Sequence, residues 1–331
     1  MKELQSIVDR LSRSPADGAV LATLVTVEGS SYRRPGARLL LTADGVRLGS
    51  ISGGCLEEDV LVRARRVAAT GRPELALYDT TTENDLVWGV GLGCHGVVQV
   101  LLEKLPPEPR WVGVLAANLR AHRPTTLVVT WRSADSSRLG TGLQAEPAKG
   151  TNAGVFVDHV PPPVALVIFG AGDDAQPLAR FAKDLGWHVT IADPRPDFAT
   201  AERFPGADAL VIAPADQLVG RVAPPPDALA VVMTHHYVHD VPLLRDLIAG
   251  SFPYVGLLGP RQRAERILAD LEHDGVVLSA ERRTCLHAPV GLDLGANTPE
   301  EVALSIIAEM RAALAARDGR PLRERRAPIH A

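Results

Sequence analysis

Residues 164–195 constrain the fold of this 331-residue chain more than any other stretch. They read as an apolar strand, a turn carrying Gly170 and Gly172, an amphipathic helix opening near Ala175, and a second apolar strand ending at Asp193. In a dinucleotide-binding βαβ unit the first glycine permits the tight turn and the second admits a pyrophosphate, while the third small residue lets helix and strand pack closely. Asp193 follows Gly170 by 23 residues, near the spacing of about 20 expected for the acidic residue that meets a ribose hydroxyl. The stretch therefore predicts a Rossmann-like unit.

The remainder of the second half alternates strands and helices, as a doubly wound parallel sheet requires. A final helix is indicated by Thr298 as N-cap, Pro299 at its first position and Glu301 closing a capping box. We expect strands at residues 166–169, 188–192, 210–213, 228–233 and 254–258.

The first half lacks this alternation and is expected to form an α+β domain. It has apolar, β-branched segments separated by glycine-rich turns and by a helix after Glu57 that stops at Gly71. Residues 38–42 and 46–51 are expected to pair as a hairpin. Further strands are expected at residues 19–27, 75–79, 97–102, 127–131 and 155–159.

Length and composition favour two soluble domains. A chain of 331 residues exceeds the usual size of one domain, and the proline run at residues 161–163 is the best linker, which gives domains 1–160 and 161–331. The net charge of −4 argues against broad nucleic-acid binding. No apolar run approaches the roughly 18 residues that span a bilayer. The first residues also lack the pattern of a signal peptide.

Cysteine usage points to a reducing compartment. The three cysteines, Cys55, Cys94 and Cys285, are too few and too scattered for a disulfide framework. We therefore expect a cytoplasmic protein. For Cys285 the better interpretation is core packing near a strand end.

Ser52-Gly53-Gly54-Cys55 places two glycines and a thiol ahead of a helix N-terminus, followed by Glu57. Such a position attracts anions, and it would lower the pKa of a thiol towards reactivity or soft-metal ligation. The alternative is a glycine turn with a small buried cysteine. Without other evidence, the favoured interpretation of Glu57 is a capping-box carboxylate.

A second glycine-rich loop, residues 89–96, contains Cys94 followed by His95. Two such loops in one small domain favour a shared pocket, although two unrelated turns would give the same pattern. No CxxC or HxxxH spacing links Cys55, Cys94 and His95, so they do not form a zinc pattern.

Basic residues supply candidate phosphate contacts. Arg33, Arg34 and Arg38 make a cationic loop whose guanidinium forks suit phosphate oxygens, although a solvated surface loop fits almost as well. His235 follows an apolar strand at the end where α/β folds bind ligands, and Arg261 opens a helix after the next strand.

Two features of the glycine turn complicate a simple dinucleotide site. Asp173 and Asp174 lie where a pyrophosphate would approach and would repel it unless they point away. Arg195 could meet a 2′-phosphate, whereas Asp193 favours a free ribose hydroxyl.

Taken together, these segments resemble the xanthine dehydrogenase accessory family of the XdhC/CoxI type. The resemblance covers nearly the whole chain, and the ordered set of segments is far more specific than any single motif. The matching segments are residues 36–57, 91–94, 169–195, 233–240, 254–259, 286–293 and 298–305.

The resemblance implies an N-terminal domain of the family's own type before the Rossmann-like domain. It also implies an accessory role rather than a catalytic one: binding molybdenum cofactor, as molybdopterin or its cytosine dinucleotide, and delivering it to a molybdenum hydroxylase such as xanthine or carbon monoxide dehydrogenase. Implied partners are this client enzyme, a cysteine desulfurase, a cofactor nucleotidyltransferase and a second copy of the chain. No nucleic acid or membrane is implied.

The working hypothesis places the pterin phosphate at Gly53-Gly54 and nearby arginines, with Cys55 or Cys94 near the metal. Cys55 is the candidate molybdenum ligand, and the nucleotide portion rests at Gly170–Ala175. One alternative is an NAD(P)-dependent oxidoreductase with His235 as acid or base. A second alternative is a non-catalytic adaptor with a vestigial Rossmann domain.

Overall fold

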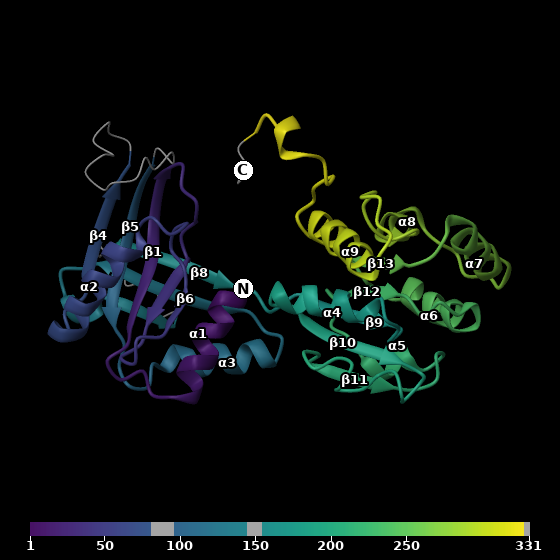
Figure 1. Cartoon of the computed structure of the whole chain (residues 1–331), viewed down its shortest axis with the longest axis horizontal. Coiled ribbons are helices and arrows are strands. Elements are labelled where there is room, and N and C mark those ends of the chain that lie inside the picture. Colours follow the sequence, from purple (N-terminus) through teal and green to yellow (C-terminus); the bar gives the residue numbers. More distant parts are fainter. Residues whose placement is uncertain (81–95, 144–153, 328–331) are drawn as a thin grey trace. The chain divides into compact units, whose positions relative to one another are not determined.

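The computed structural model describes residues 1–80, 96–143 and 154–327. The chain divides into two units, Met1–Pro162 and Pro163–Ala331 (Figure 1). Each unit has hydrophobic core clusters of its own.

A five-stranded antiparallel sheet forms the centre of the first unit, in the order β3-β2-β1-β5-β4. The expected hairpin of residues 38–51 is confirmed, because β2 pairs with β3 antiparallel. A smaller antiparallel sheet has the order β7-β6-β8. The strands are β1 (Val20–Gly29), β2 (Arg38–Leu41), β3 (Arg47–Gly49), β4 (Glu74–Asp79), β5 (Gly96–Lys104), β6 (Thr125–Arg132), β7 (Gly140–Leu143) and β8 (Gly154–Val160).

Helices cover both faces of the five-stranded sheet. Helix α2 (Glu57–Thr70) packs Val60, Ala64 and Val67 on one face, because these residues lie three or four apart and form one apolar stripe. Helices α1 (Lys2–Arg13) and α3 (Arg110–Arg120) share a core cluster with the other face. Helix α2 ends at Gly71, whose φ of 70° is the left-handed conformation that glycine adopts without strain.

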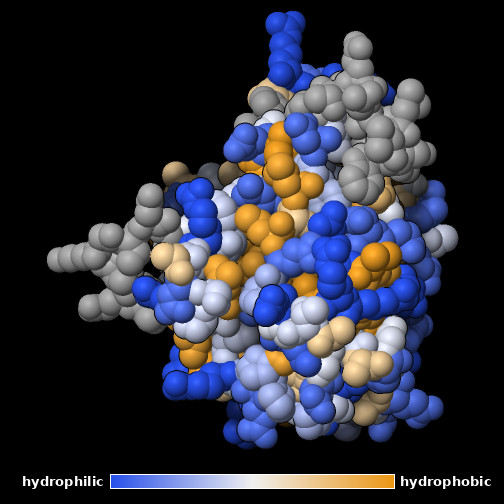
Figure 2. Space-filling model, turned by 90° about the vertical axis from the view of Figure 1, so that its left-hand side faces the viewer, coloured by the Kyte–Doolittle hydropathy of each residue, from blue (hydrophilic) through white to orange (hydrophobic). Residues whose placement is uncertain are grey.

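The outer edge of this sheet is β4, and it is partly uncovered. Leu75 and Leu77 are 37% and 58% exposed, whereas Ala76 and Tyr78, which alternate with them, are buried. This alternation is that of a strand with one face on the core. Figure 2 views the first unit from the side of β4 and α2 and shows apolar surface among hydrophilic side chains.

A polar pair is buried on the face of the sheet opposite α2. Arg38 of β2 is only 3% exposed, and its Nη1 donates to Asp158 Oδ2 of β8 at 2.7 Å and to the Gly36 carbonyl at 3.0 Å. Glu103 of β5 is buried nearby and accepts hydrogen bonds from the Thr141 amide at 2.9 Å and hydroxyl at 2.5 Å. Burial raises the pKa of Glu103, although the Thr141 hydrogen bonds and the charge of Arg38 oppose the shift.

A raised pKa makes Glu103 a source of pH dependence in the first unit. The folded state binds its proton more tightly than the unfolded state, so the contribution of Glu103 is complete below the ordinary pKa of a glutamate and is lost as pH rises. Glu103→Gln, whose amide oxygen can still accept from Thr141, should therefore gain stability over the wild type as pH rises from 5 to 9. Urea unfolding at each pH measures this difference. The exposed Glu108→Gln is the control, and a difference for Glu103→Gln that did not change with pH would contradict the prediction.

The second unit is a six-stranded parallel sheet in the order β11-β10-β9-β12-β13-β14. The expected Rossmann-like doubly wound sheet, beside an N-terminal α+β unit, is confirmed. Its strands are β9 (Ala165–Phe169), β10 (His188–Asp193), β11 (Ala209–Ile212), β12 (Leu229–Val232), β13 (Tyr254–Leu257) and β14 (Leu286–His287).

Helices lie on both faces of the parallel sheet (Figure 1). Helices α4 and α9 pack with Ile168 and Val189 on one face, and α6 and α7 pack with Phe169 and Val232 on the other. The predicted capping box of Thr298 and Glu301 is present at the start of α9. The helices are α4 (Ala175–Asp184), α5 (Leu218–Val222), α6 (Tyr237–Ala249), α7 (Arg261–His273), α8 (Ala280–Cys285) and α9 (Pro299–Leu314).

Within the described ranges, no helix combines the length and the apolar character needed to cross a bilayer.

Candidate functional site

The strand order of the second unit reverses between β9 and β12, which is where such sheets bind ligands. Gly170 follows β9 at this point with a φ of +115°. A Cβ on Gly170 would lie 2.6 Å from the backbone carbonyl of Met233, which follows β12. The two strand ends therefore approach so closely that only glycine fits.

The turn after Gly170 presents free backbone donors. Among the described residues, the N–H groups of Gly172, Asp173 and Asp174 have no protein acceptor, whereas those of Gly170 and Ala171 are bonded. Gly172 is partly exposed, and Ala175 begins α4 as a fully buried residue. Unpaired N–H groups at a helix N-terminus are the usual cradle for a phosphate.

The two aspartates of this turn each contact the side chain of a distant arginine or histidine. Asp173 Oδ1 accepts from Arg203 Nη2 at 2.9 Å, and the same nitrogen donates to the Ala171 carbonyl at 3.2 Å. Asp174 Oδ2 lies 3.0 Å from His235 Nε2. The ion pair with Arg203 thus reduces the repulsion that a bound phosphate would otherwise meet from Asp173.

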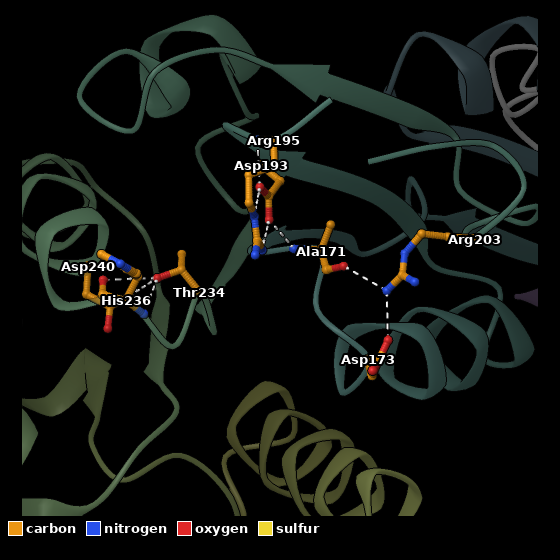
Figure 3. A network of polar contacts seen from close by, with 8 residues as sticks. All are labelled: Ala171, Asp173, Asp193, Arg195, Arg203, Thr234, His236 and Asp240. Carbon is orange, nitrogen blue, oxygen red and sulfur yellow. Dashed lines mark hydrogen bonds and ion pairs between the residues drawn. The ribbon is translucent and has the colours of Figure 1, made fainter. Parts of the chain in front are cut away.

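Asp193, at the end of β10, is fully buried and completely engaged (Figure 3). Its Oδ2 accepts from the Ala171 amide at 2.6 Å and Arg195 Nη2 at 2.8 Å, and its Oδ1 accepts from Arg195 N at 2.8 Å and Nε at 2.9 Å. Burial opposes ionisation, but the hydrogen bonds from Arg195 and Ala171 hold the pKa of Asp193 below its ordinary value. The Arg195 guanidinium also lies 3.8 Å from the centre of the Phe198 ring.

The turn after β12 is fixed by a buried acid that the sequence did not single out as a site residue. Asp240 of α6 is 1% exposed and accepts from Thr234 Oγ1 at 2.5 Å and from Arg263 Nη2. Arg263 also donates to the His235 carbonyl at 3.2 Å. These contacts hold His235 at a φ of 57°, with its side chain 53% exposed beside Gly172.

Arg203 and Arg263 were likewise not identified from the sequence. Each contacts a residue 23 or more positions away, so no local pattern points to its role. Arg261, which was identified, begins α7 after the β13 strand end and is exposed.

In the first unit, Glu57 holds the loop before α2 and does not close the expected capping box, because the N-cap residue Leu56 has no side-chain cap hydrogen bond. Its carboxylate accepts from the Ser52 amide at 2.9 Å, the Ser50 hydroxyl at 3.0 Å and the Ser52 hydroxyl. The Ser52 hydroxyl in turn accepts from the amides of Gly54 and Leu56, each at 3.2 Å. Despite burial, which acts in the opposite direction, the hydrogen bonds from Ser52 and Ser50 lower the pKa of Glu57.

The loop that Glu57 braces places Cys55 at a small pocket of about 30 Å³. Gly53 lies against the Tyr32 ring, and Gly54 has a φ of 111°. Cys55 is a free, partly exposed thiol. Cys94 lies outside the described residues, so the predicted meeting of the two cysteine loops is untested. The pocket is lined in part by Ser30, Tyr32, Ser52, Cys55, Thr80 and Gly96.

The structure gives Arg38 a different role from the one predicted. Its burial and its pairing with Asp158 leave the guanidinium inaccessible to a phosphate from solvent. The periodicity of β2 explains this position, because Arg38 shares a face with the buried Leu40. Of the other two arginines, Arg33 contacts Glu3 and the Ser50 carbonyl, and Arg34 is exposed.

Comparison with known sequences identifies the family. Residues 166–310 match the XdhC Rossmann domain, and residues 13–79 match the XdhC and CoxI family. A Bacillus subtilis protein described as a probable subunit of xanthine dehydrogenase is 34% identical over 94% of this chain and 97% of its own length. The chain belongs to the XdhC and CoxI family. The resemblance found in the sequence is thereby confirmed.

Two further relatives of the chain are an insertion chaperone and a protein whose crystal structure is known. The molybdenum cofactor insertion chaperone PaoD of Escherichia coli is 27% identical over 88% of this chain and 82% of its own length. A crystal structure of a Bacillus halodurans protein described as a xanthine dehydrogenase aligns with a TM-score of 0.79 at 30% identity. That alignment covers 97% of this chain and 99% of the other.

Proposed function

We propose that this protein is a molybdenum cofactor insertion chaperone that serves a xanthine dehydrogenase-type molybdenum hydroxylase. The observation that carries the proposal is similarity along most of the chain to two relatives, one described as such a chaperone and the other as a probable subunit of xanthine dehydrogenase. The cofactor is cargo, which the protein holds and releases without chemical change.

We assign the phosphate-bearing end of the cargo to the glycine turn of the second unit. Three unpaired N–H groups at Gly172–Asp174 and the adjacent Arg203 provide donors to phosphate oxygens. Because such a cradle suits a pyrophosphate, we extend the proposal to the dinucleotide form of the cofactor. His235 and Arg261 belong to this proposed site through their places at the neighbouring strand ends.

For the first unit, taken by itself, we propose that the loop of Ser52, Gly53, Gly54 and Cys55 can contact the metal. The partly exposed Cys55 thiol offers a soft ligand for the metal or a contact to the dithiolene. Glu57 holds this loop through Ser52 rather than touching cargo.

Cofactor binding tests the proposal directly. The purified chain is incubated with molybdopterin or its cytosine dinucleotide, desalted, and assayed for molybdenum by elemental analysis and for pterin by fluorescence after oxidation. We expect both to be retained at one cofactor per chain, and the loaded protein to activate a cofactor-free hydroxylase. Retention of neither would contradict the proposal and favour an adaptor, and hydride turnover with NAD(P)H would favour an oxidoreductase.

Cys55→Ala is expected to weaken cofactor retention by at least about tenfold, because it removes the proposed thiol contact. Cys285→Ala is the matched control, since Cys285 is also a free, partly exposed thiol but belongs to the other unit. Equal retention by the wild type and Cys55→Ala would remove Cys55 from the ligand role, and equal loss in both variants would show a nonspecific effect.

A further inference from the structure

We propose that Arg195 is a specificity-determining residue that prevents NAD(H) and NADP(H) from binding at the Rossmann-like sheet. It does so by occupying the hydrogen-bond acceptor sites of the Asp193 carboxylate. In dinucleotide-binding folds the acid at the end of the second strand accepts hydrogen bonds from the adenosine ribose. Asp193 holds that position at the end of β10.

Asp193 has no hydrogen-bond acceptor site left for a ribose hydroxyl group. A carboxylate has about four acceptor sites on its two oxygens. In Asp193 all four are taken by donors from Ala171 and Arg195, at 2.6 to 2.9 Å. The side chain is 0% exposed, so a ribose hydroxyl has neither a free lone pair nor a path to it.

Ribose cannot readily displace Arg195 from this position. Its fork makes two charge-assisted hydrogen bonds to a buried anion, and neutral hydroxyl groups would not replace the lost positive charge. The guanidinium is also held on its other side by the Phe198 ring at 3.8 Å.

The same pairing opposes the 2′-phosphate of NADP(H). An arginine that recognises this group must have its charge available, whereas the charge of Arg195 is already balanced by Asp193 at 2.8 Å. A 2′-phosphate would therefore meet a neutral pair.

Phosphate binding elsewhere in the crevice is compatible with this exclusion. Arg203 forms an ion pair with Asp173, whose side chain is 83% exposed. An exposed ion pair contributes little to stability, so Arg203 can exchange the Asp173 carboxylate for a phosphate. The crevice thus suits a phosphate-bearing ligand that is not recognised through the adenosine ribose. The inference does not depend on binding of the molybdenum cofactor. It can fail while the proposed function holds, and the proposed function can fail while the inference holds.

NADH fluorescence titration of the full chain tests the inference. We expect no saturable binding of NADH or NADPH by the wild type. In Arg195→Ala one acceptor site on each Asp193 oxygen becomes available, and NADH should bind saturably with a Kd at least about tenfold below the highest concentration titrated with the wild type. Arg180→Ala is the matched control, because it removes an exposed arginine of the same unit that lies over a phenylalanine ring, that of Phe181 at 5.4 Å, but that does not contact Asp193. Its NADH binding should remain as weak as that of the wild type.

Arg195→Gln provides a second variant with a milder change, since a neutral amide lacks the charged fork with which the Arg195 side chain fills one acceptor site on each oxygen. Circular dichroism confirms that each variant is folded. Tight binding of NADH or NADPH by the wild type would overturn the proposal by itself. So would folded Arg195→Ala or Arg195→Gln proteins whose affinity for NADH does not rise.

Discussion

Gly170→Ala should destabilise the second unit by about 3 kcal/mol or more and abolish phosphate binding at the glycine turn. The methyl group would lie 2.6 Å from the carbonyl carbon and oxygen of Met233 and 2.8 Å from the Thr234 amide nitrogen. These are backbone atoms, so no side-chain rotation relieves the overlap, and the φ of +115° adds strain for any residue with a Cβ. The ends of β9 and β12 would have to separate.

Urea unfolding and titration with inorganic pyrophosphate measure the two effects of Gly170→Ala. Gly220→Ala in α5 is the matched control, because its Cβ would meet nothing within 4 Å and helix interiors favour alanine by about 1 kcal/mol. A Gly170→Ala protein as stable as Gly220→Ala, with wild-type pyrophosphate affinity, would refute the close approach of the two strand ends.

Asp158→Asn should destabilise the first unit by about 3 kcal/mol, because it leaves the buried charge of Arg38 without its counter-ion. Arg38 Nε and Nη2 already lack a hydrogen-bond partner among the described residues, so the guanidinium depends heavily on this one carboxylate. Glu103 is no substitute, since burial raises its pKa and favours its neutral form.

Chemical unfolding of the first unit measures the loss, and Glu58→Gln is the control. It also removes one carboxylate paired with an arginine, but the Arg47–Glu58 pair is exposed and should contribute at most about 1 kcal/mol. The double variant Arg38→Leu with Asp158→Leu should recover much of the stability, because a matched apolar pair leaves no charge buried. A single variant as stable as Glu58→Gln would contradict the interpretation.

Local pattern was enough to predict the Rossmann-like unit. A glycine turn between an apolar strand and an amphipathic helix, an acid at the next strand end, and a capping box at Thr298 each depend on residues near in sequence. The physical preferences of those residues are nearly independent of the rest of the chain. At the Ser52–Glu57 turn the capping-box interpretation of Glu57 was wrong, because its carboxylate accepts from the loop before the helix and α2 has no side-chain cap.

Contacts across the sequence could not be predicted in this way. Asp173 and Asp174 were expected to repel a phosphate unless they point away, and only the fold brings Arg203 and His235 beside them from 30 and 61 residues away. The pattern placed Arg38 among surface cations, although its alternation with Leu39 already put it on the same face as the buried Leu40.

Local sequence patterns predict that a parallel doubly wound sheet follows the prolines at residues 161–163, and they show an acid and an arginine two positions apart at Asp193 and Arg195. The role of Asp193 depends on contacts that form only in the folded protein. Its carboxylate meets the Ala171 amide because β10 lies beside β9 in the sheet, and Phe198 returns to hold the guanidinium in place. A hydrogen bond joins atoms that are close in space, and strand order sets that distance. Spacing along the chain could therefore predict that Asp193 binds a ribose. It could not show that the carboxylate oxygens of Asp193 already accept hydrogen bonds from other residues of the protein.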